Sequence, residues 1–396
     1  MARRQLWELP ELNYKEEQGE HRKVTWLELF FDLFFVVSIA QLAHSLSRNP
    51  SWTSMADFAL MFIPIWWVWV GFTYYNERFE SNGLENRLAT FLVMLTVIGL
   101  AVFGHHGPVD GFSGFACSYA AARFILIMLW LRAAFHVPSF RPTGTRFIIG
   151  FSLSVVLTLT AAFIGTPFGY KLFGMALVID LLTPFTTARP QKKLPRVSSS
   201  KLPERFGLFI IIVLGETIVG VVNGVAGVHH FTVQLFIKSA LAVALGFSFW
   251  WIYFDCIGQS APKKGPQWMF AWIYLHLPLV LAIVATGAGI SSVLGGTTEG
   301  SSEELRQIIA SAVGVFLFAA ACLEITLHRQ DGKPTHKYFS STIKLLAGFL
   351  SLAAGWLDIM SSFFSLLLVL LALLACQMIY GAWVWYKETA VSNQEK

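Results

Sequence analysis

The sequence predicts an all-α polytopic membrane protein with about 12 transmembrane helices, arranged as two parallel six-helix repeats. Of its 396 residues, 55% are hydrophobic and only 13% are charged, whereas about 25% of the residues of a soluble domain are charged. Apolar runs of about 20 residues recur along the chain, and a helix of that length crosses a bilayer. No polar segment between these runs is long enough to form a soluble domain.

The apolar runs place the expected spans in order along the chain. They are residues 25–47, 55–76, 85–104, 113–134, 146–166 and 168–187, followed by 204–227, 232–255, 268–294, 304–327, 338–356 and 360–386. The fifth and sixth spans form one stretch longer than a bilayer is thick, as do the last two, so each stretch must turn back once. We expect the turns at 166–169 and near 355–358.

The lysines and arginines orient these spans. If the N-terminus lies in the cytosol, all but five of the 29 basic residues fall in cytosolic segments or at the cytosolic ends of spans. The exceptions are Arg48, Lys171, Lys238 and Arg306 in outer loops and Arg123 within a span. Because basic residues favour the cytosolic side of a membrane, we expect both termini in the cytosol. A net charge of +5 spread over short loops does not indicate a nucleic-acid partner.

A basic segment rich in proline and serine, residues 188–203, divides the chain in two. We interpret it as a cytosolic linker between an N-terminal six-helix repeat, 1–187, and a C-terminal six-helix repeat, 204–396. The start of the first repeat aligns with the start of the second without a gap, and a Trp-Trp pair occurs in the second span of each. Because six is even, the two repeats are expected to share one orientation, as in other parallel-repeat transporters.

The first span carries two acids, Glu28 and Asp32, in its first third. An ionisable group in hydrocarbon costs about 3 kcal/mol on insertion scales, so such groups face protein or water. Residues four apart share one face of a helix. The pair therefore indicates a polar pathway or polar packing inside a membrane bundle.

The same span carries a family resemblance. The run Trp26-Leu-Glu-Leu-Phe-Phe-Asp32, continuing to His44, resembles the opening of the bacterial low temperature requirement protein A (LtrA) family. The run Glu204-Arg-Phe-Gly-Leu-Phe-Ile-Ile-Ile-Val-Leu-Gly-Glu216-Thr is similar to a mid-chain signature of that family. The resemblance implies a polytopic protein of the bacterial plasma (inner) membrane that is linked to growth in the cold. It does not imply a reaction or a cargo.

A looser resemblance bears on mechanism. Phe31-Asp32 and the residues after it resemble the Phe-Ser-Asp signature in the first helix of lysosomal potassium and proton channels with six-plus-six spans. That resemblance implies pore-lining first helices in each repeat. Here Phe31 replaces the serine, and Leu208 stands opposite Asp32 in the second repeat, which weakens the case for potassium conduction.

Further polar residues fall in the predicted cytosolic half of the spans. They are Asn76, Glu77, Asp180, Asp255, His276 and Glu324. Because lipid excludes such groups, we expect them to converge on a cytosolic cavity or on each other. The structural alternative is that each acid caps a helix or pairs with an arginine such as Arg22, Arg78, Arg87 or Arg205, and we favour it for Glu77, Asp255 and Glu324.

The seventh span places Glu216 and Asn223 on one helix stripe with Gly220, Gly224 and Gly227. Small residues at this spacing allow close helix packing. Glu216 is either a protonatable site on a pathway-lining helix or a protonated acid bonded within a tight contact, and the sequence leaves both readings open.

Two remaining features concern a mid-span arginine and a set of histidines. Arg123 needs an acid or an aqueous cavity, and its candidate partners are Glu216, Asp32 and Asp180.

The histidines near the outer ends of spans are His44, His105, His106, His229 and His230. They are weak candidates for a metal site, because no carboxylate–histidine spacing accompanies them.

The chain lacks the motifs of the common enzyme classes: it has no Walker loop, no GxGxxG, no HExxH and no Gly-x-Ser-x-Gly. We therefore expect neither catalysis nor a cofactor. The hypothesis is a secondary transporter or ion/proton channel whose carboxylate-lined pathway comprises Glu28, Asp32, Glu216, Asn223 and Arg123. The alternative is a non-transporting protein that binds a lipid or isoprenoid and whose acids are structural. The expected partners are the lipid bilayer and a small ion or solute, with a homodimer left open.

Overall fold

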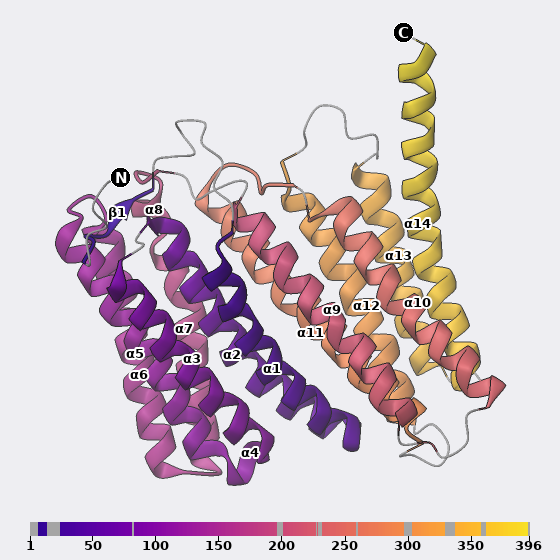
Figure 1. Ribbon diagram of the computed structural model, residues 1–396, viewed down its shortest axis with the longest axis horizontal. Coiled ribbons are helices and arrows are strands. Elements are labelled where there is room, and N and C mark those ends of the chain that lie inside the picture. Colours follow the sequence, from indigo (N-terminus) through magenta and orange to yellow (C-terminus); the bar gives the residue numbers. More distant parts are fainter. Residues whose placement is uncertain are drawn as a thin grey trace. The chain divides into compact units, whose positions relative to one another are not determined.

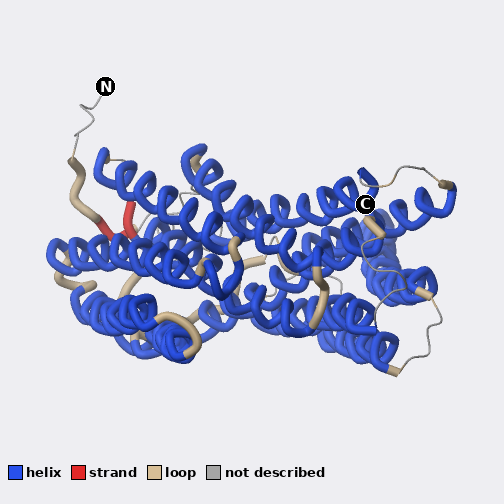
Figure 2. Tube along the Cα trace, turned by 90° about the horizontal axis from the view of Figure 1, so that it is seen from below, coloured by secondary structure: helices blue, strands red, loops and turns tan. Residues whose placement is uncertain are grey.

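The computed structural model describes residues 7–13, 24–80, 83–195, 201–226, 228, 232–258, 260–296, 303–328, 337–357 and 362–394 (Figure 1). Within these ranges, twelve helices are long and apolar enough to cross a membrane. Almost all of the described chain is helical, and its two short strands form a single ribbon (Figure 2). The predicted all-α architecture and the number of spans are confirmed.

The first six of these helices follow the predicted order. They are α1 (Trp26–Arg48), α2 (Trp52–Arg78), α3 (Leu84–His105), α5 (Phe112–His136), α6 (Arg141–Ile164) and α7 (Phe168–Thr186). The short helices α4 (Gly107–Asp110) and α8 (Ala188–Gln191) follow α3 and α7. The long stretch 146–187 turns back as expected, because Gly165 ends α6 in a left-handed conformation (φ 71°) that favours glycine.

The other six long helices are α9 (Lys201–Ala226), α10 (Val233–Cys256), α11 (Pro266–Leu294), α12 (Glu303–Thr326), α13 (Lys337–Trp356) and α14 (Phe363–Gln394). The stretch 338–386 also divides as expected, between α13 and α14. The ends of the helices differ from the predicted spans by a few residues, most at the C-terminus, where α14 continues to Gln394.

The chain forms two compact units. The first contains Met1–Leu42, Ala59–Arg205 and Gly265–Phe270, and the second contains Ala43–Phe58, Phe206–Lys264 and Ala271–Lys396. The assignment of 1–187 and 204–396 as repeats, joined by 188–203, stays a prediction, and part of that linker, 196–200, lies outside the described residues.

In the first unit, α5 packs against α3 and α6, and α6 packs against α7. Buried aromatic rings fill this core: the ring of Trp130 stacks on those of Phe147 and Phe140, with centroid distances of 5.0 and 5.5 Å. The strands β1 (Glu11–Leu12) and β2 (Phe79–Glu80) pair antiparallel. This ribbon attaches the N-terminal segment to the end of α2.

In the second unit, α12 packs against α13, and α10 packs against α14. The glycine stripe of α9 faces α11: a Cβ atom on Gly220 would lie 2.8 Å from the carbonyl oxygen of Gly287, and one on Gly224 would lie 2.9 Å from that of Ser291. These two glycines therefore permit a close approach of two helix backbones.

A buried charge cluster as the candidate functional site

The first acid of α1 stabilises the start of its own helix. The Oε2 atom of Glu28 accepts hydrogen bonds from the backbone N–H of Thr25 at 2.9 Å and from its hydroxyl at 3.0 Å. The Thr25 hydroxyl in turn accepts one from the N–H of Glu28 at 3.3 Å. This reciprocal pattern is a capping box. It fixes the carboxylate so that its other oxygen, Oε1, faces Lys201 at 2.6 Å.

The second acid lies one helical turn deeper. Asp32 is fully buried, and its Oδ1 atom accepts hydrogen bonds from the indole N–H of Trp69 at 2.7 Å and from Arg205 at 3.2 Å. Within the described chain, its Oδ2 atom has no hydrogen-bond partner. Residues of α2 and α9 thus donate hydrogen bonds to one oxygen of this buried carboxyl group, and the other oxygen receives none from the described residues.

Two basic residues of α9 complete the arrangement. Lys201 lies between two acids, with its Nζ atom 2.6 Å from Glu28 and 3.2 Å from Glu77 Oε1. Arg205 contacts Asp32 and, at 3.5 Å, Glu28, and its guanidinium lies 5.8 Å from the ring centre of Phe31. We refer to Glu28, Asp32, Glu77, Lys201 and Arg205 as the charge cluster. All five are buried and belong to the first unit.

The charges of this cluster do not balance. Among the described residues, three carboxyl groups face two cations, and Asp32 Oδ2 and both oxygens of Glu77 lack a hydrogen-bond partner. Each acid lies within 3.5 Å of at least one cation, but two cations cannot neutralise three carboxylates, and a buried net charge costs free energy. The arrangement therefore favours binding of one further positive charge, which a proton or a small cation supplies.

A cavity of about 380 Å³ borders the cluster. Glu28 and Arg205 form part of its wall, together with Asn76 and Arg87. Its lining residues come from the starts of α1, α3 and α9 and from the end of α2, so the cavity lies at one end of the helices of this unit. The Oδ1 atom of Asn76 is buried and has no hydrogen-bond partner among the described residues.

The sequence singled out only part of this site. It favoured a purely structural role for Glu77, named Arg205 only as a pairing partner and did not single out Lys201 or Trp69. A signal was present: Lys201 and Arg205 are four residues apart near the start of a span. The two acids Glu28 and Asp32 have the same spacing. Because residues four apart share one helix face, an acidic face of one helix and a basic face of another could have been predicted to meet.

The mid-span arginine has a different partner from those of the cluster. Arg123 of α5 forms a buried ion pair of 2.6 Å with Asp180 of α7, and the hydroxyl of Tyr119 also donates to Asp180. The guanidinium lies 4.1 Å from the ring centre of Phe151. Of the three acids considered from the sequence, Asp180 is thus the one that pairs with Arg123.

Three of the further polar residues predicted in the cytosolic half of the spans, Asp255, His276 and Glu324, belong to the second unit. Two of them, His276 and Glu324, have partners there. His276 is buried, with Nδ1 2.7 Å from the carbonyl oxygen of Trp272 and Nε2 3.0 Å from the hydroxyl of Tyr253. Glu324 pairs with Lys344 at 3.2 Å and accepts hydrogen bonds from two serines of α13, Ser340 and Ser341. The third, Asp255, is exposed at the end of α10.

The two predicted pathway residues of α9 are less enclosed than the charge cluster. Glu216 is half-buried and Asn223 is exposed. Among the described residues, neither side chain has a hydrogen-bond or ion-pair partner.

Of the arginines predicted to pair with the acids, Arg22 lies outside the described residues, and Arg78 instead donates hydrogen bonds to Tyr74 and Gln191.

Of the histidines considered for a metal site, His44 is exposed, and the neighbouring rings of His105 and His106 have centroids 6.2 Å apart. No group of three or more His, Cys, Asp or Glu side chains is placed to hold a metal ion in the described part of the chain. His229 and His230 lie outside it.

These features define a multi-pass helical membrane protein with charged residues buried between its spans. The chain belongs to the family of bacterial low temperature requirement A proteins (LtrA), which it matches over residues 23–384. It is also 30% identical over 304 residues to an uncharacterized protein of Rhizobium meliloti (strain 1021), a match that covers 69% of this chain and 70% of that protein. The predicted family membership is confirmed. Neither match bears on the lysosomal channels, so that resemblance stays a prediction.

Proposed function

We propose that this protein moves protons or small cations across the bacterial inner membrane, as a secondary transporter or a channel, and that the charge cluster binds the ion. The observation that supports the proposal is the surplus carboxyl group: in the described part of the chain, three buried acids share two cations. A cluster built only for packing gains little from a third acid, because that acid must share a cation with another acid and its burial still costs free energy.

Within the cluster, Asp32 and Glu77 are the groups that exchange the ion. In the described chain, one carboxyl oxygen of Asp32 and both of Glu77 lack a hydrogen-bond partner, although Glu77 Oε1 is ion-paired with Lys201; both oxygens of Glu28 are hydrogen-bonded. Arg205 and Lys201 hold the carboxyl groups in place and limit the negative charge of the site to one. The cluster thus alternates between a charge of minus one and neutrality as the ion leaves and returns.

In this proposal the ion enters through the cavity, which reaches Glu28 and Arg205, and passes from there to Asp32 and Glu77, which do not line it. It lies where α1 and α3 begin, which is the cytosolic side if both termini are cytosolic. Glu216 and Asn223 belong to the second unit, and their place in a pathway stays a prediction from the sequence. In this proposal the buried pair of Arg123 and Asp180 stabilises the bundle without carrying the ion, and the protein performs no catalysis.

Ion flux into liposomes that contain the purified protein tests the proposal. We expect flux of protons, or of sodium or potassium, above that of empty liposomes. Asp32→Asn removes the surplus charge and should abolish flux, while the protein still elutes as a single species, because both cations keep a carboxylate partner. Asp110→Asn makes the same chemical change at an exposed position of α4 and should leave the flux unchanged.

Two outcomes would contradict the proposal. One is normal flux in the Asp32→Asn protein, which would make Asp32 structural. The other is a wild-type protein that, in sealed and correctly assembled liposomes, passes none of the three ions faster than lipid alone.

A further inference from the structure

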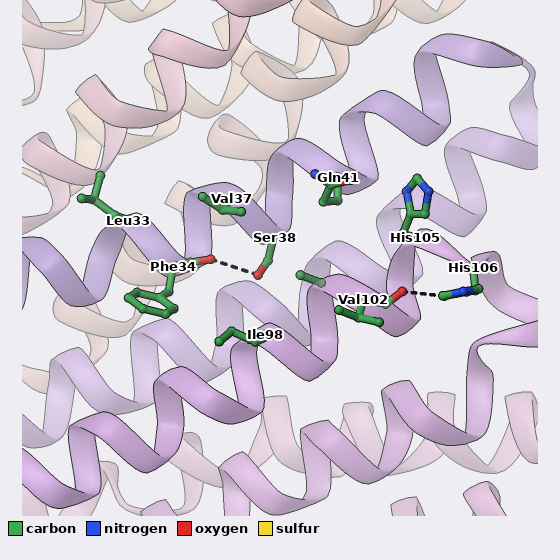
Figure 3. A pocket seen from close by; sticks show the side chains of 10 residues that line it. Leu33, Phe34, Val37, Ser38, Gln41, Ile98, Val102, His105 and His106 are labelled. Atoms are coloured by element: carbon green, nitrogen blue, oxygen red, sulfur yellow. Dashed lines mark hydrogen bonds between the residues drawn. The ribbon is translucent and has the colours of Figure 1, made fainter.

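A second feature of the first unit is independent of the charge cluster. A groove of about 500 Å³ runs between α1 and α3 (Figure 3). Its walls are apolar side chains of both helices: Leu33, Phe34 and Val37 from α1, with Ile98, Ala101 and Val102 from α3. Because α1 and α3 are both candidate spans, the groove lies along the depth of a bilayer, where its surroundings are acyl chains.

The one hydroxyl in the middle of the groove is hidden. Ser38 is buried, and its Oγ atom lies 3.0 Å from the carbonyl oxygen of Phe34 and 3.2 Å from that of Val97. The wall therefore presents hydrocarbon over its whole middle section. An acyl chain fits such a wall, whereas a polar solute would lose hydrogen bonds on entering it.

The polar groups of the groove gather at one end. They are Gln41 of α1 and His105 and His106 at the end of α3 (Figure 3). Gln41 lies well inside α1, yet in the described part of the chain its amide has no hydrogen-bond partner. A ligand oxygen at this position could accept a hydrogen bond from the amide. Because α3 ends beside it at His105, this end of the groove lies at the level of lipid head groups.

The two histidines complete the polar end. The ring Nδ1 of His106 lies 2.8 Å from the carbonyl oxygen of Val102, which can only accept a hydrogen bond, so Nδ1 carries the proton. The ring of His105 is exposed. Together with Gln41, these rings offer hydrogen-bonding groups to a ligand that has oxygen atoms at the end of a hydrocarbon chain.

We propose that this groove is a binding site for one membrane phospholipid. One acyl chain lies along α1 and α3, and its ester and phosphate oxygens accept hydrogen bonds from Gln41 and His105. In a bilayer an acyl chain gains little by exchanging lipid neighbours for protein, since both are equally apolar. The polar end therefore distinguishes a bound phospholipid from the lipids that only surround the protein.

The test uses the full-length protein in vesicles of phosphatidylethanolamine and phosphatidylglycerol that contain a phospholipid with a photoreactive diazirine in one acyl chain. After illumination, peptides are mapped for attached lipid, both in vesicles and after dilution of the bulk lipid into detergent. We expect labelling to concentrate on 33–41 and 98–106 and to persist in detergent.

Variants separate a built site from general lipid contact. Val37→Trp and Ile98→Trp place a large ring in the groove at exposed positions, and they should abolish the persistent labelling. Val156→Trp on α6 makes the same change at a position of similar exposure, 59% against 57% for Val37, and should not affect it. Gln41→Leu keeps the apolar fit, so it should retain labelling in vesicles and lose it in detergent.

Labelling spread evenly over all exposed helix faces would overturn the proposal, as would identical labelling in Val37→Trp and Val156→Trp. Elution of each variant as a single species shows that the loss reflects the groove rather than misfolding.

Discussion

Replacing Arg205 with methionine tests the charge balance of the cluster. Arg205 is the cation that pairs with Asp32, at 3.2 Å, and both side chains are fully buried. The substitution keeps much of the side-chain volume but leaves three carboxyl groups with Lys201 alone. Removing one partner of a buried ion pair costs about 3–5 kcal/mol.

The protein can limit this cost by protonating Asp32. For an aspartate with the ordinary pKa of about 3.9, protonation at pH 7 costs about 4 kcal/mol, so the free energy of unfolding should fall by about that amount. The cost of protonation decreases by about 1.4 kcal/mol for each unit by which the pH is lowered. The Arg205→Met protein should therefore recover stability relative to wild type between pH 7 and pH 5.

Unfolding by sodium dodecyl sulfate, followed by tryptophan fluorescence, measures these differences. The double variant Arg205→Met/Asp32→Asn restores the original surplus of one carboxyl group, so it should recover most of the lost stability without recovering ion flux. Arg141→Met, at an exposed arginine of α6, is the control and should change stability by about 0.5 kcal/mol or less. The reasoning is refuted if Arg205→Met is as stable as wild type, or if adding Asp32→Asn restores nothing.

Two further predictions concern helix packing and orientation. Gly224→Ala should destabilise the protein by about 1–3 kcal/mol, because its Cβ would lie 2.7 Å from Leu294 Cβ. Gly215→Ala on the same helix meets no atom within 4 Å and should be neutral or stabilising by up to about 1 kcal/mol; equal effects in thermal unfolding would contradict the packing of α9 on α11. In a background without other cysteines, Pro108→Cys should react with an impermeant thiol reagent applied to intact cells and Pro195→Cys should not, whereas the opposite pattern would invert the proposed topology.

Local properties of the sequence were enough to predict the spans. The hydropathy and length of a span, and the breaks at 166–169 and 355–358, depend only on the local sequence. Each helix can therefore be located without knowledge of its neighbours. The membrane adds a strong constraint, since ionisable groups must avoid lipid. For that reason the sequence could also predict that Glu28 and Asp32, four residues apart, face protein or water, and the structure buries both.

The partners of the charged residues were decided only by the tertiary structure. The sequence offered three acids for Arg123, and the packing of α5, α6 and α7 brings Asp180 to it. It predicted that Glu77 caps a helix or pairs with an arginine, and the structure pairs it with Lys201, which lies between Glu77 and Glu28. Helical periodicity shows which residues share a face, but which faces meet depends on contacts between residues far apart in the sequence, 57 positions for Arg123 and Asp180 and 173 for Glu28 and Lys201. The surplus carboxyl group, and with it the proposed ion site, is therefore a property of helix packing rather than of any single helix.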